Sequence, residues 1–244
     1  MDSWLNGAGQ FFNPAARLTA VAVAPGESCI VIDEALANPQ GLVSWAAGRE
    51  FHAPQGFPYP GVIVDAPPAV STMVADYFAA HARGRLGGRR TLSATVRLSL
   101  VTVPPHALRP VQWQCHRDRL GSVPRDLRLA AMVAYLFRDP ALGGTSFYRS
   151  LQSEADTDRM IEDAGRMSGA EFSARYGLEP GYLSGSNRYF ERVAQIPAAW
   201  NRMLFYNGDL FHSGDVTAPQ RLSGDARTGR LTLNGFFTCR SALH

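Results

Sequence analysis

The chain has 244 residues, a net charge of +3, a hydrophobic fraction of 45% and a charged fraction of 18%. These values are typical of one globular domain with its own core, and they exclude a chain dominated by disorder. No apolar run approaches the roughly 18 residues of a membrane span, and the first residues lack the pattern of a secretory signal. We therefore expect a cytoplasmic protein that binds neither a membrane nor a nucleic acid.

The basic and sulfur-containing residues limit the kinds of ligand and metal site that we expect. All 24 basic residues are arginine, so any cationic anchor for an anionic ligand has to be a guanidinium, which binds carboxylates as a planar fork. The densest group, residues 83–90, lies among glycines and predicts a solvated loop instead of a nucleic-acid surface. Three cysteines far apart in sequence predict buried thiols and no disulfide or structural zinc site: Cys29, Cys115 and Cys239.

The N-terminal third mixes short elements. Residues 29–32 are apolar and predict a strand. Residues 38–47 have helical spacing, with Asn38 as the N-cap. Residues 52–68 are rich in proline and glycine and predict a loop. Residues 68–81 then predict a second helix, because their apolar side chains recur on one helical face.

From residue 91 the pattern changes to strands. Residues 92–103 alternate apolar and polar side chains, which is typical of a half-buried strand. A helical pattern with a capping box at Ser168 and Glu171 lies in an insertion at about residues 152–187. Further strands are predicted at residues 112–118, 130–137, 146–149, 202–206 and 230–239. The prediction is a mainly β protein with flanking helices (α+β), a single domain over residues 1–244 with a mixed support region (1–90) and a jelly-roll core (91–240).

His116 and Asp118 are the first candidate metal ligands. Side chains two positions apart on a strand project to the same face, so these two can reach one point while Arg117 faces the other way. One imidazole and one carboxylate are two of the three ligands of the facial triad that holds non-haem iron. His212, at the end of an apolar run just before a loop, is the best candidate for the third ligand. The remaining histidines lie in the N-terminal region, in an apparent turn or at the chain end: His52, His81, His106 and His244.

The order of these motifs resembles the prolyl-hydroxylase-like branch of the 2-oxoglutarate/Fe(II) oxygenases, and most closely a bacterial group within that superfamily. The similar stretch runs from about residue 111 to residue 239. Its matching segments are HRD at 116–118, LAAMVAYLF at 129–137, GGTSFY at 143–148, WNRMLFYNGDLFHSG at 200–214 and RLTLNGFF at 230–237.

The resemblance implies a double-stranded β-helix, a jelly-roll or cupin-like fold, that uses Fe(II), 2-oxoglutarate and O2. It implies His116, Asp118 and His212 as the metal ligands. Arg230 would pair with the distal carboxylate of 2-oxoglutarate, with Thr232 and Tyr135 as further donors. The implied reaction is hydroxylation of a small-molecule or peptidyl substrate, with release of succinate and CO2.

Several alternatives stay open at this point. Arg221 lies nine positions after His212 and is the rival to Arg230, which lies 18 positions after it; we prefer Arg230 because it opens an apolar strand.

Asn234 shares the predicted face of Arg230 and is either a pocket residue or a hydrogen-bonding residue of the barrel. The pair at residues 143–144 predicts a tight turn; we prefer a purely structural role for it, and the alternative is that the turn also closes the pocket beside the metal. The other possible functions are a catalytically silent binding module and a cupin-like metalloprotein that does not use 2-oxoglutarate. The oligomeric state is left open.

Overall fold

The computed structural model describes residues 10–119, 123–124 and 126–242. Its strands form a seven-stranded sheet in the order β1-β2-β8-β5-β10-β4-β3 and a three-stranded sheet in the order β7-β6-β9, and every strand pair is antiparallel. The large sheet contains β1 (Leu18–Ala24), β2 (Glu27–Ile32), β3 (Gly61–Asp65), β4 (Gly88–Val101), β5 (Leu127–Tyr135), β8 (Met203–Asn207) and β10 (Arg230–Ser241). The small sheet contains β6 (Thr145–Ser150), β7 (Phe190–Ile196) and β9 (Phe211–Gly214).

Four α-helices and five short 3-10 helices complete the described structure. The α-helices are α2 (Pro39–Ala47), α3 (Pro68–His81), α4 (Glu154–Arg166) and α5 (Gly169–Tyr176). The 3-10 helices are η1 (Gly84–Leu86), η2 (Pro105–Ala107), η3 (Pro110–Gln112), η4 (Pro140–Leu142) and η5 (Pro219–Arg221). None of the helices in the described ranges has both the length and the apolar character that a membrane crossing requires.

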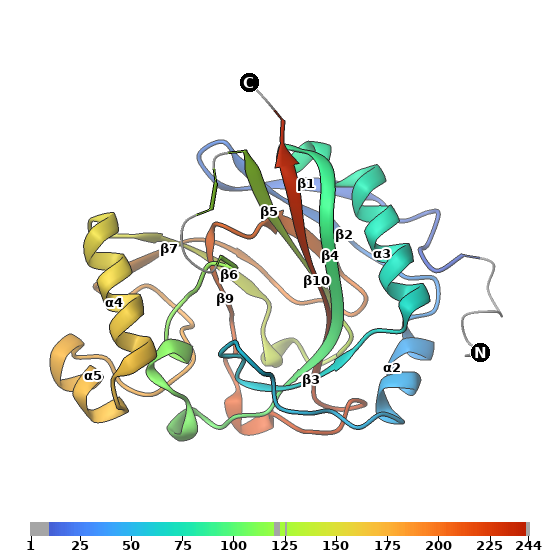
Figure 1. Cartoon of the computed structure of the whole chain (residues 1–244). Coiled ribbons are helices and arrows are strands. Elements are labelled where there is room, and N and C mark those ends of the chain that lie inside the picture. The colour runs from blue at the N-terminus through green and yellow to red at the C-terminus, as the bar shows by residue number, and fades with distance from the viewer. Residues whose placement is uncertain (1–9, 120–122, 125, 243–244) are drawn as a thin grey trace.

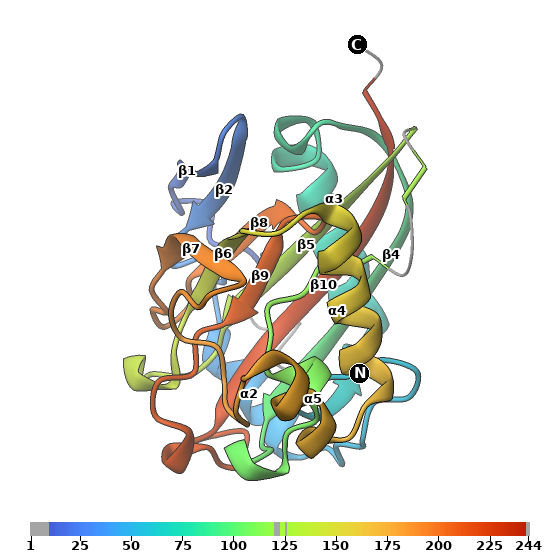
Figure 2. The same ribbon diagram turned by 90° about the vertical axis from the view of Figure 1, so that its left-hand side faces the viewer.

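The two sheets pack face to face. In Figure 2 the strands β6, β7 and β9 form a layer in front of the large sheet. Val133 and Leu204 from the large sheet pack with Phe147 and Ile196 from the small sheet in one buried apolar cluster. Because side chains alternate between the two faces of a strand, the neighbours of these residues on the large sheet point the opposite way, toward a second core.

That second core lies between the large sheet and the helices α2 and α3, which run beside it in Figure 1. Val74 and Phe78 of α3 are fully buried there, and the Phe78 ring stacks on Phe237 of β10 with the ring centroids 3.9 Å apart. The Asn38 side chain accepts a hydrogen bond of 2.9 Å from the Gly41 N–H. Both predicted N-terminal helices and the Asn38 cap are therefore confirmed.

The insertion forms α4 and α5, which cover the outer face of the small sheet. Met160 and Phe172 from these helices pack with Tyr148 and Phe211 of the sheet in a third buried cluster. The capping box predicted at the start of α5 is present. The three cysteines are buried free thiols, as predicted.

Two of the predicted loops contain regular structure that the sequence did not predict. Within residues 52–68 the segment Gly61–Asp65 is the edge strand β3, paired with β4 from Gly61↔Val101 to Asp65↔Arg97. The prolines flank the paired residues without occupying them, and Gly61 is required because a Cβ there would lie 1.9 Å from the Leu100 carbonyl oxygen. The predicted loop at residues 83–90 is η1 followed by the first residues of β4, where Arg90 pairs with Arg240 of β10.

The predicted strand at residues 112–118 is wrong. The segment begins as η3 and continues without regular structure, apart from one β-bridge at His116. Two side-chain contacts fix the turn: the Gln112 amide oxygen accepts from the Arg109 N–H at 2.8 Å, and the Trp113 indole N–H donates to the Leu108 carbonyl at 2.9 Å.

Candidate metal centre

His116 and His212 are brought together by backbone pairing. His212 lies in β9, and His116 extends the small sheet past β9 through an isolated antiparallel bridge. Each backbone N–H donates to the carbonyl of the other residue at 2.9 Å. Residues directly opposite in such a pair project their side chains from the same face of the sheet, and the two ring centroids are 4.5 Å apart.

Asp118 completes the group. Its N–H donates to the Gly208 carbonyl at 2.8 Å, just after β8, and a Cβ at position 208 would lie 3.0 Å from Asp118 Oδ2. Asp118 Oδ1 is 3.8 Å from His116 Nε2, and Oδ2 is 3.6 Å from His212 Nε2. One ligand atom from each of the three residues lies within 4.8 Å of the others.

The charges of this cluster suit a divalent cation. Burial raises the pKa of Asp118 to about 6, against the opposing effects of His116 and Arg97. Burial lowers the pKa of His212 to about 4. Burial and the neighbouring His212 also lower the pKa of His116, although solvent reaches 55% of that side chain and weakens the desolvation. Two neutral imidazoles and one carboxylate are the donor set of non-haem iron sites.

Two further features of the three side chains fit a metal ion. Among the described residues, Asp118 Oδ2 is buried and has no hydrogen-bond donor, which is costly for a carboxylate oxygen. His212 Nδ1 lies 2.8 Å from the Leu210 carbonyl oxygen, so this nitrogen carries the proton and Nε2 keeps its lone pair. The unsatisfied oxygen and the oriented imidazole both fit a metal ion between them.

Arg230 is buried at the start of β10, and its guanidinium holds a backbone turn. Nε donates to the Leu142 carbonyl at 2.8 Å, and Nη2 donates to the carbonyls of Gly143 and Gly144 at 3.2 and 3.0 Å. Nη1 makes no hydrogen bond with any residue that the structure describes. Arg230 therefore stabilises the turn through Nε and Nη2, and its Nη1 remains available to another acceptor.

The glycine pair of that turn explains its conformation. Gly143 has φ +83°, and a Cβ there would lie 1.6 Å from the Asp215 carbonyl oxygen. At Gly144 a Cβ would lie 2.0 Å from the Ile196 carbonyl oxygen. The predicted tight turn is confirmed, and it is wedged between the end of β7 and the residue that follows β9.

Thr232 and Tyr135 are direct cross-strand partners of β10 and β5. The Tyr135 hydroxyl is 2.8 Å from the Thr145 hydroxyl. Asn234 donates from Nδ2 to the hydroxyls of Thr232 and Ser99 at 2.9 and 3.0 Å. Of the two interpretations of Asn234, the hydrogen-bonding role is the one that these contacts support.

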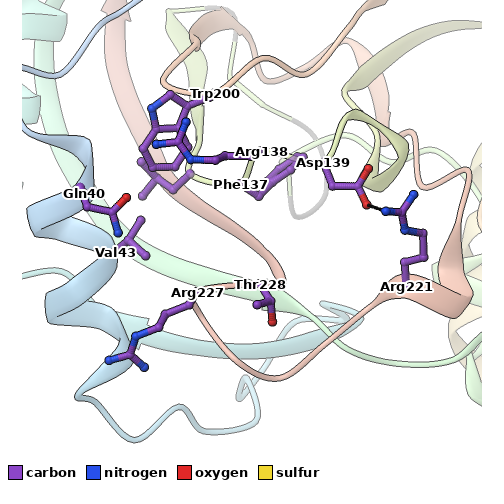
Figure 3. A pocket seen from close by; sticks show the side chains of 10 residues that line it. Gln40, Val43, Phe137, Arg138, Asp139, Trp200, Arg221, Arg227 and Thr228 are labelled. Atoms are coloured by element: carbon purple, nitrogen blue, oxygen red, sulfur yellow. Dashed lines mark ion pairs between the residues drawn. The ribbon is translucent and has the colours of Figure 1, made fainter.

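Arg221 lies apart from the metal-centre residues. It ends η5, its side chain is 56% exposed, and it pairs with Asp139 at 2.8 Å. Figure 3 shows this pair at the edge of a cavity of about 350 Å³ that is also lined by Gln40 and Trp200. None of the three metal-centre residues lines that cavity.

Sequence reasoning missed Tyr59 and Arg97. The Tyr59 hydroxyl is buried without a hydrogen-bond partner among the described residues; burial raises its pKa, and the Arg230 charge and the Ser99 hydroxyl oppose the rise. Tyr59 precedes the unpredicted strand β3, so nothing local marked it. Arg97 lies in the alternating stretch that became β4, two positions from Ser99, and that alternation was the available signal for its direction.

Solved structures resemble this chain at low identity. HygX from Streptomyces hygroscopicus, with nickel, 2-oxoglutarate and hygromycin B bound, matches with a TM-score of 0.45 and 16% identity, over 88% of this chain and 83% of that chain. SnoN, a non-heme α-ketoglutarate-dependent epimerase from nogalamycin biosynthesis, matches with a TM-score of 0.45 and 14% identity, over 88% and 78%. A prolyl-4-hydroxylase from Pseudomonas putida matches with a TM-score of 0.40 and 18% identity, over 93% and 95%.

A search of curated proteins finds no match to the sequence. The model of one protein family does match, and it spans residues 14–237, which include all three metal-centre residues. The chain therefore belongs to DUF6445, a family of unknown function.

Proposed function

We propose that the protein is an Fe(II)- and 2-oxoglutarate-dependent oxygenase that hydroxylates a small-molecule or peptidyl substrate, with His116, Asp118 and His212 as the metal ligands. One observation carries the proposal: two imidazoles and a buried carboxylate with an unsatisfied oxygen converge from segments far apart in the sequence. When bound, iron supplies the activation of O2 and the oxidation of substrate, coupled to decarboxylation of 2-oxoglutarate to succinate.

The residues around the three metal ligands orient the ligand side chains. The Leu210 carbonyl fixes the orientation of the His212 ring, and the Asp118 N–H anchors its residue to the Gly208 carbonyl. Tyr206 packs its ring against His212, with the centroids 4.8 Å apart. Three protein ligands leave the rest of the coordination sphere of iron to cosubstrate and O2. Solvent contact with His116, on the open side, leaves a route for substrate.

We assign the distal carboxylate of 2-oxoglutarate to the end of the pocket near Arg230, with Thr232 and Tyr135. A buried carboxylate needs a cation and several donors to offset its desolvation. The unbonded Nη1 of Arg230 and the partnerless hydroxyl of Tyr59 are the donors that the described contacts leave open. Two packed antiparallel sheets with the ligands along one edge support a double-stranded β-helix as the fold of this single domain.

One observation favours a second candidate, a cupin-like metalloprotein that does not use 2-oxoglutarate. The Arg230 guanidinium already serves three backbone carbonyls, which is a sufficient structural reason for its presence. Titration of 2-oxoglutarate into the Mn(II)-loaded protein separates the two candidates. The oxygenase predicts saturable binding that depends on the metal, and the second candidate predicts none.

Succinate formation tests the activity itself. The protein is incubated with Fe(II), ascorbate, 2-oxoglutarate and O2, and succinate is measured with and without pools of candidate substrates. We expect slow succinate formation without substrate, and loss of that activity in His212→Ala. The matched control is His106→Ala, because His106 is exposed in η2. Equal succinate formation by His212→Ala and the unchanged protein contradicts the proposal.

A further inference from the structure

Arg97 is a cation in the inner face of the large sheet, directly opposite Asp65 of β3. The Asp118 and Asp65 carboxylates act on its charge from beyond ion-pair distance. Its guanidinium carbon lies 4.0 Å from the centroid of the Phe57 ring and 4.5 Å from that of Phe236. Its Nε is buried and has no hydrogen-bond acceptor among the residues that the structure describes, and no carboxylate in those ranges lies within ion-pair distance of it. Leaving a charged donor unsatisfied is costly, so the aromatic contacts stabilise the cation without using its hydrogen-bonding edge.

The strand register places Arg97 on the face that looks toward the metal centre. Arg97 is the direct partner of Asn234, and the next row toward the C-terminal end of β10 contains Phe236, Ala131 and Tyr206. Tyr206 packs against His212. The Arg97 charge also acts on Asp118 and lowers the pKa of that carboxyl against the effect of burial. Arg97 therefore borders the region in which the proposed chemistry takes place.

Arg97 and Arg230 arise from different rows of the large sheet. Arg97 pairs with Asn234, whereas Arg230 pairs with Val101, four residues further along β4. At about 3.4 Å per residue, the backbone positions of the two rows are separated by roughly 14 Å. If Arg230 serves the cosubstrate, Arg97 is available to a different carboxylate.

We propose that Arg97 is the binding residue for the carboxylate of an organic-acid substrate, gripped by the guanidinium edge between Phe57 and Phe236. This inference rests on the proposed oxygenase function and names its substrate class. A carboxylate matches the planar donors of an arginine in a bidentate way. The rings of Phe57 and Phe236 add an apolar and aromatic lining for the body of the acid.

The first arm of the test separates substrate from cosubstrate. Binding of 2-oxoglutarate to the Mn(II)-loaded protein is measured by calorimetry for the unchanged protein and for Arg97→Gln. We expect affinities within about threefold of each other, whereas Arg230→Gln loses binding. A loss of tenfold or more in Arg97→Gln assigns Arg97 to the cosubstrate and overturns the proposal.

The second arm observes Arg97 directly. In the ¹⁵N-labelled protein with Zn(II) and saturating 2-oxoglutarate, the Arg97 Nε–H resonance is assigned by its loss in Arg97→Gln. We expect a saturable shift with acetate, benzoate or 3-phenylpropionate, and none with 3-phenylpropionamide. Arg90→Gln, an exposed position on the same strand, keeps the shift. Absence of a saturable shift with all three acids overturns the proposal, and so does an equal shift with the amide.

The two proposals fail separately. The acid titration is repeated on the metal-free protein, where neither iron nor 2-oxoglutarate is needed for a shift of the Arg97 resonance. If 2-oxoglutarate does not bind but the Arg97 resonance shifts with acids alone, the oxygenase assignment fails and the carboxylate site remains. If 2-oxoglutarate binds and turns over but the resonance does not shift, only the substrate class is wrong.

Discussion

His116 and His212 lie 96 positions apart in the sequence, yet they exchange both of their backbone hydrogen bonds, at 2.9 Å each. The β-bridge fixes the separation of the two imidazoles before any ion binds. Asp118 is tied to the same region through its N–H bond to the Gly208 carbonyl. The centre is therefore positioned by the backbone, and the ligand side chains need little rearrangement to meet a cation.

Metal binding should stabilise the fold, because a buried oxygen of Asp118 has no hydrogen-bond donor among the described residues. At a metal concentration a hundredfold above the dissociation constant, the free energy of unfolding should rise by about 2.7 kcal/mol. The measurement is urea unfolding with and without Zn(II). In Asp118→Asn we expect the metal-dependent gain to disappear.

In the metal-free protein we expect Asp118→Asn to cause no loss of stability. An amide at position 118 removes the cost of burying a carboxylate, so metal-free Asp118→Asn should unfold at the same urea concentration as the unchanged protein or at a higher one. Marked destabilisation of the metal-free variant would mean that Asp118 is a structural residue.

Replacement of Arg230 should destabilise the turn at residues 142–144. Arg230→Met leaves three backbone carbonyls without their donors, and we expect the free energy of unfolding to fall by about 3 kcal/mol. The matched control is Arg221→Met, which removes a half-exposed ion pair with Asp139 and should cost less than about 1 kcal/mol. Equal losses in urea unfolding would show that the Arg230 guanidinium does not hold the turn at residues 142–144.

Much of this fold is encoded locally. The helices α2 and α3 were predictable because the Asn38 cap and the recurrence of Val70, Val74 and Phe78 lie within a few turns of chain. The strand β4 was predictable from its alternation. The strands β3, β7 and β9 were not predicted, because their pairing depends on partners distant in sequence.

The residues of the candidate site could also be predicted only in part from the sequence. The spacing of His116 and Asp118 and the position of His212 marked the ligands, although the strand predicted around the first two does not exist. The two side chains still converge, through a turn and a single bridge instead of a regular strand. Tyr59 and Arg97 became candidates only once β3 and β4 were seen to pair, since this pairing lines the inner face of the sheet.

A side chain at position 144 should displace the strands next to the metal centre and destabilise the protein. In Gly144→Ala the new Cβ would meet the Ile196 carbonyl oxygen at 2.0 Å, so β6 and β7 must separate beside the β9 strand that carries His212. We expect a loss of several kcal/mol in stability, measured by thermal unfolding. Gly165→Ala, in α4 with open space around it, should instead stabilise the protein by about 0.5–1 kcal/mol.

Arg119 should hold α4 against the segment that contains Asp118. Its guanidinium lies 3.4 Å from Asp209, 3.7 Å from Glu154 and 4.0 Å from Asp158, and only 19% of its side chain is exposed. In Arg119→Gln we expect amide hydrogen exchange in the first turns of α4 to increase about tenfold, equivalent to about 1.4 kcal/mol.

The control for this prediction is Arg159→Gln, which removes an exposed ion pair with Asp156 within the same helix. Such pairs contribute little to stability, so exchange in α4 should stay unchanged. If both variants raise the exchange rate equally, the contacts of Arg119 with Glu154 and Asp158 do not hold the helix.

Anomalous diffraction from a crystal grown anaerobically with Fe(II) and 2-oxoglutarate tests the central claim most directly. We predict one peak at the iron absorption edge, at coordination distances of about 2.0–2.2 Å from His116 Nε2, His212 Nε2 and an Asp118 carboxylate oxygen. A peak elsewhere, or one from which any of these three side chains points away, would contradict the account.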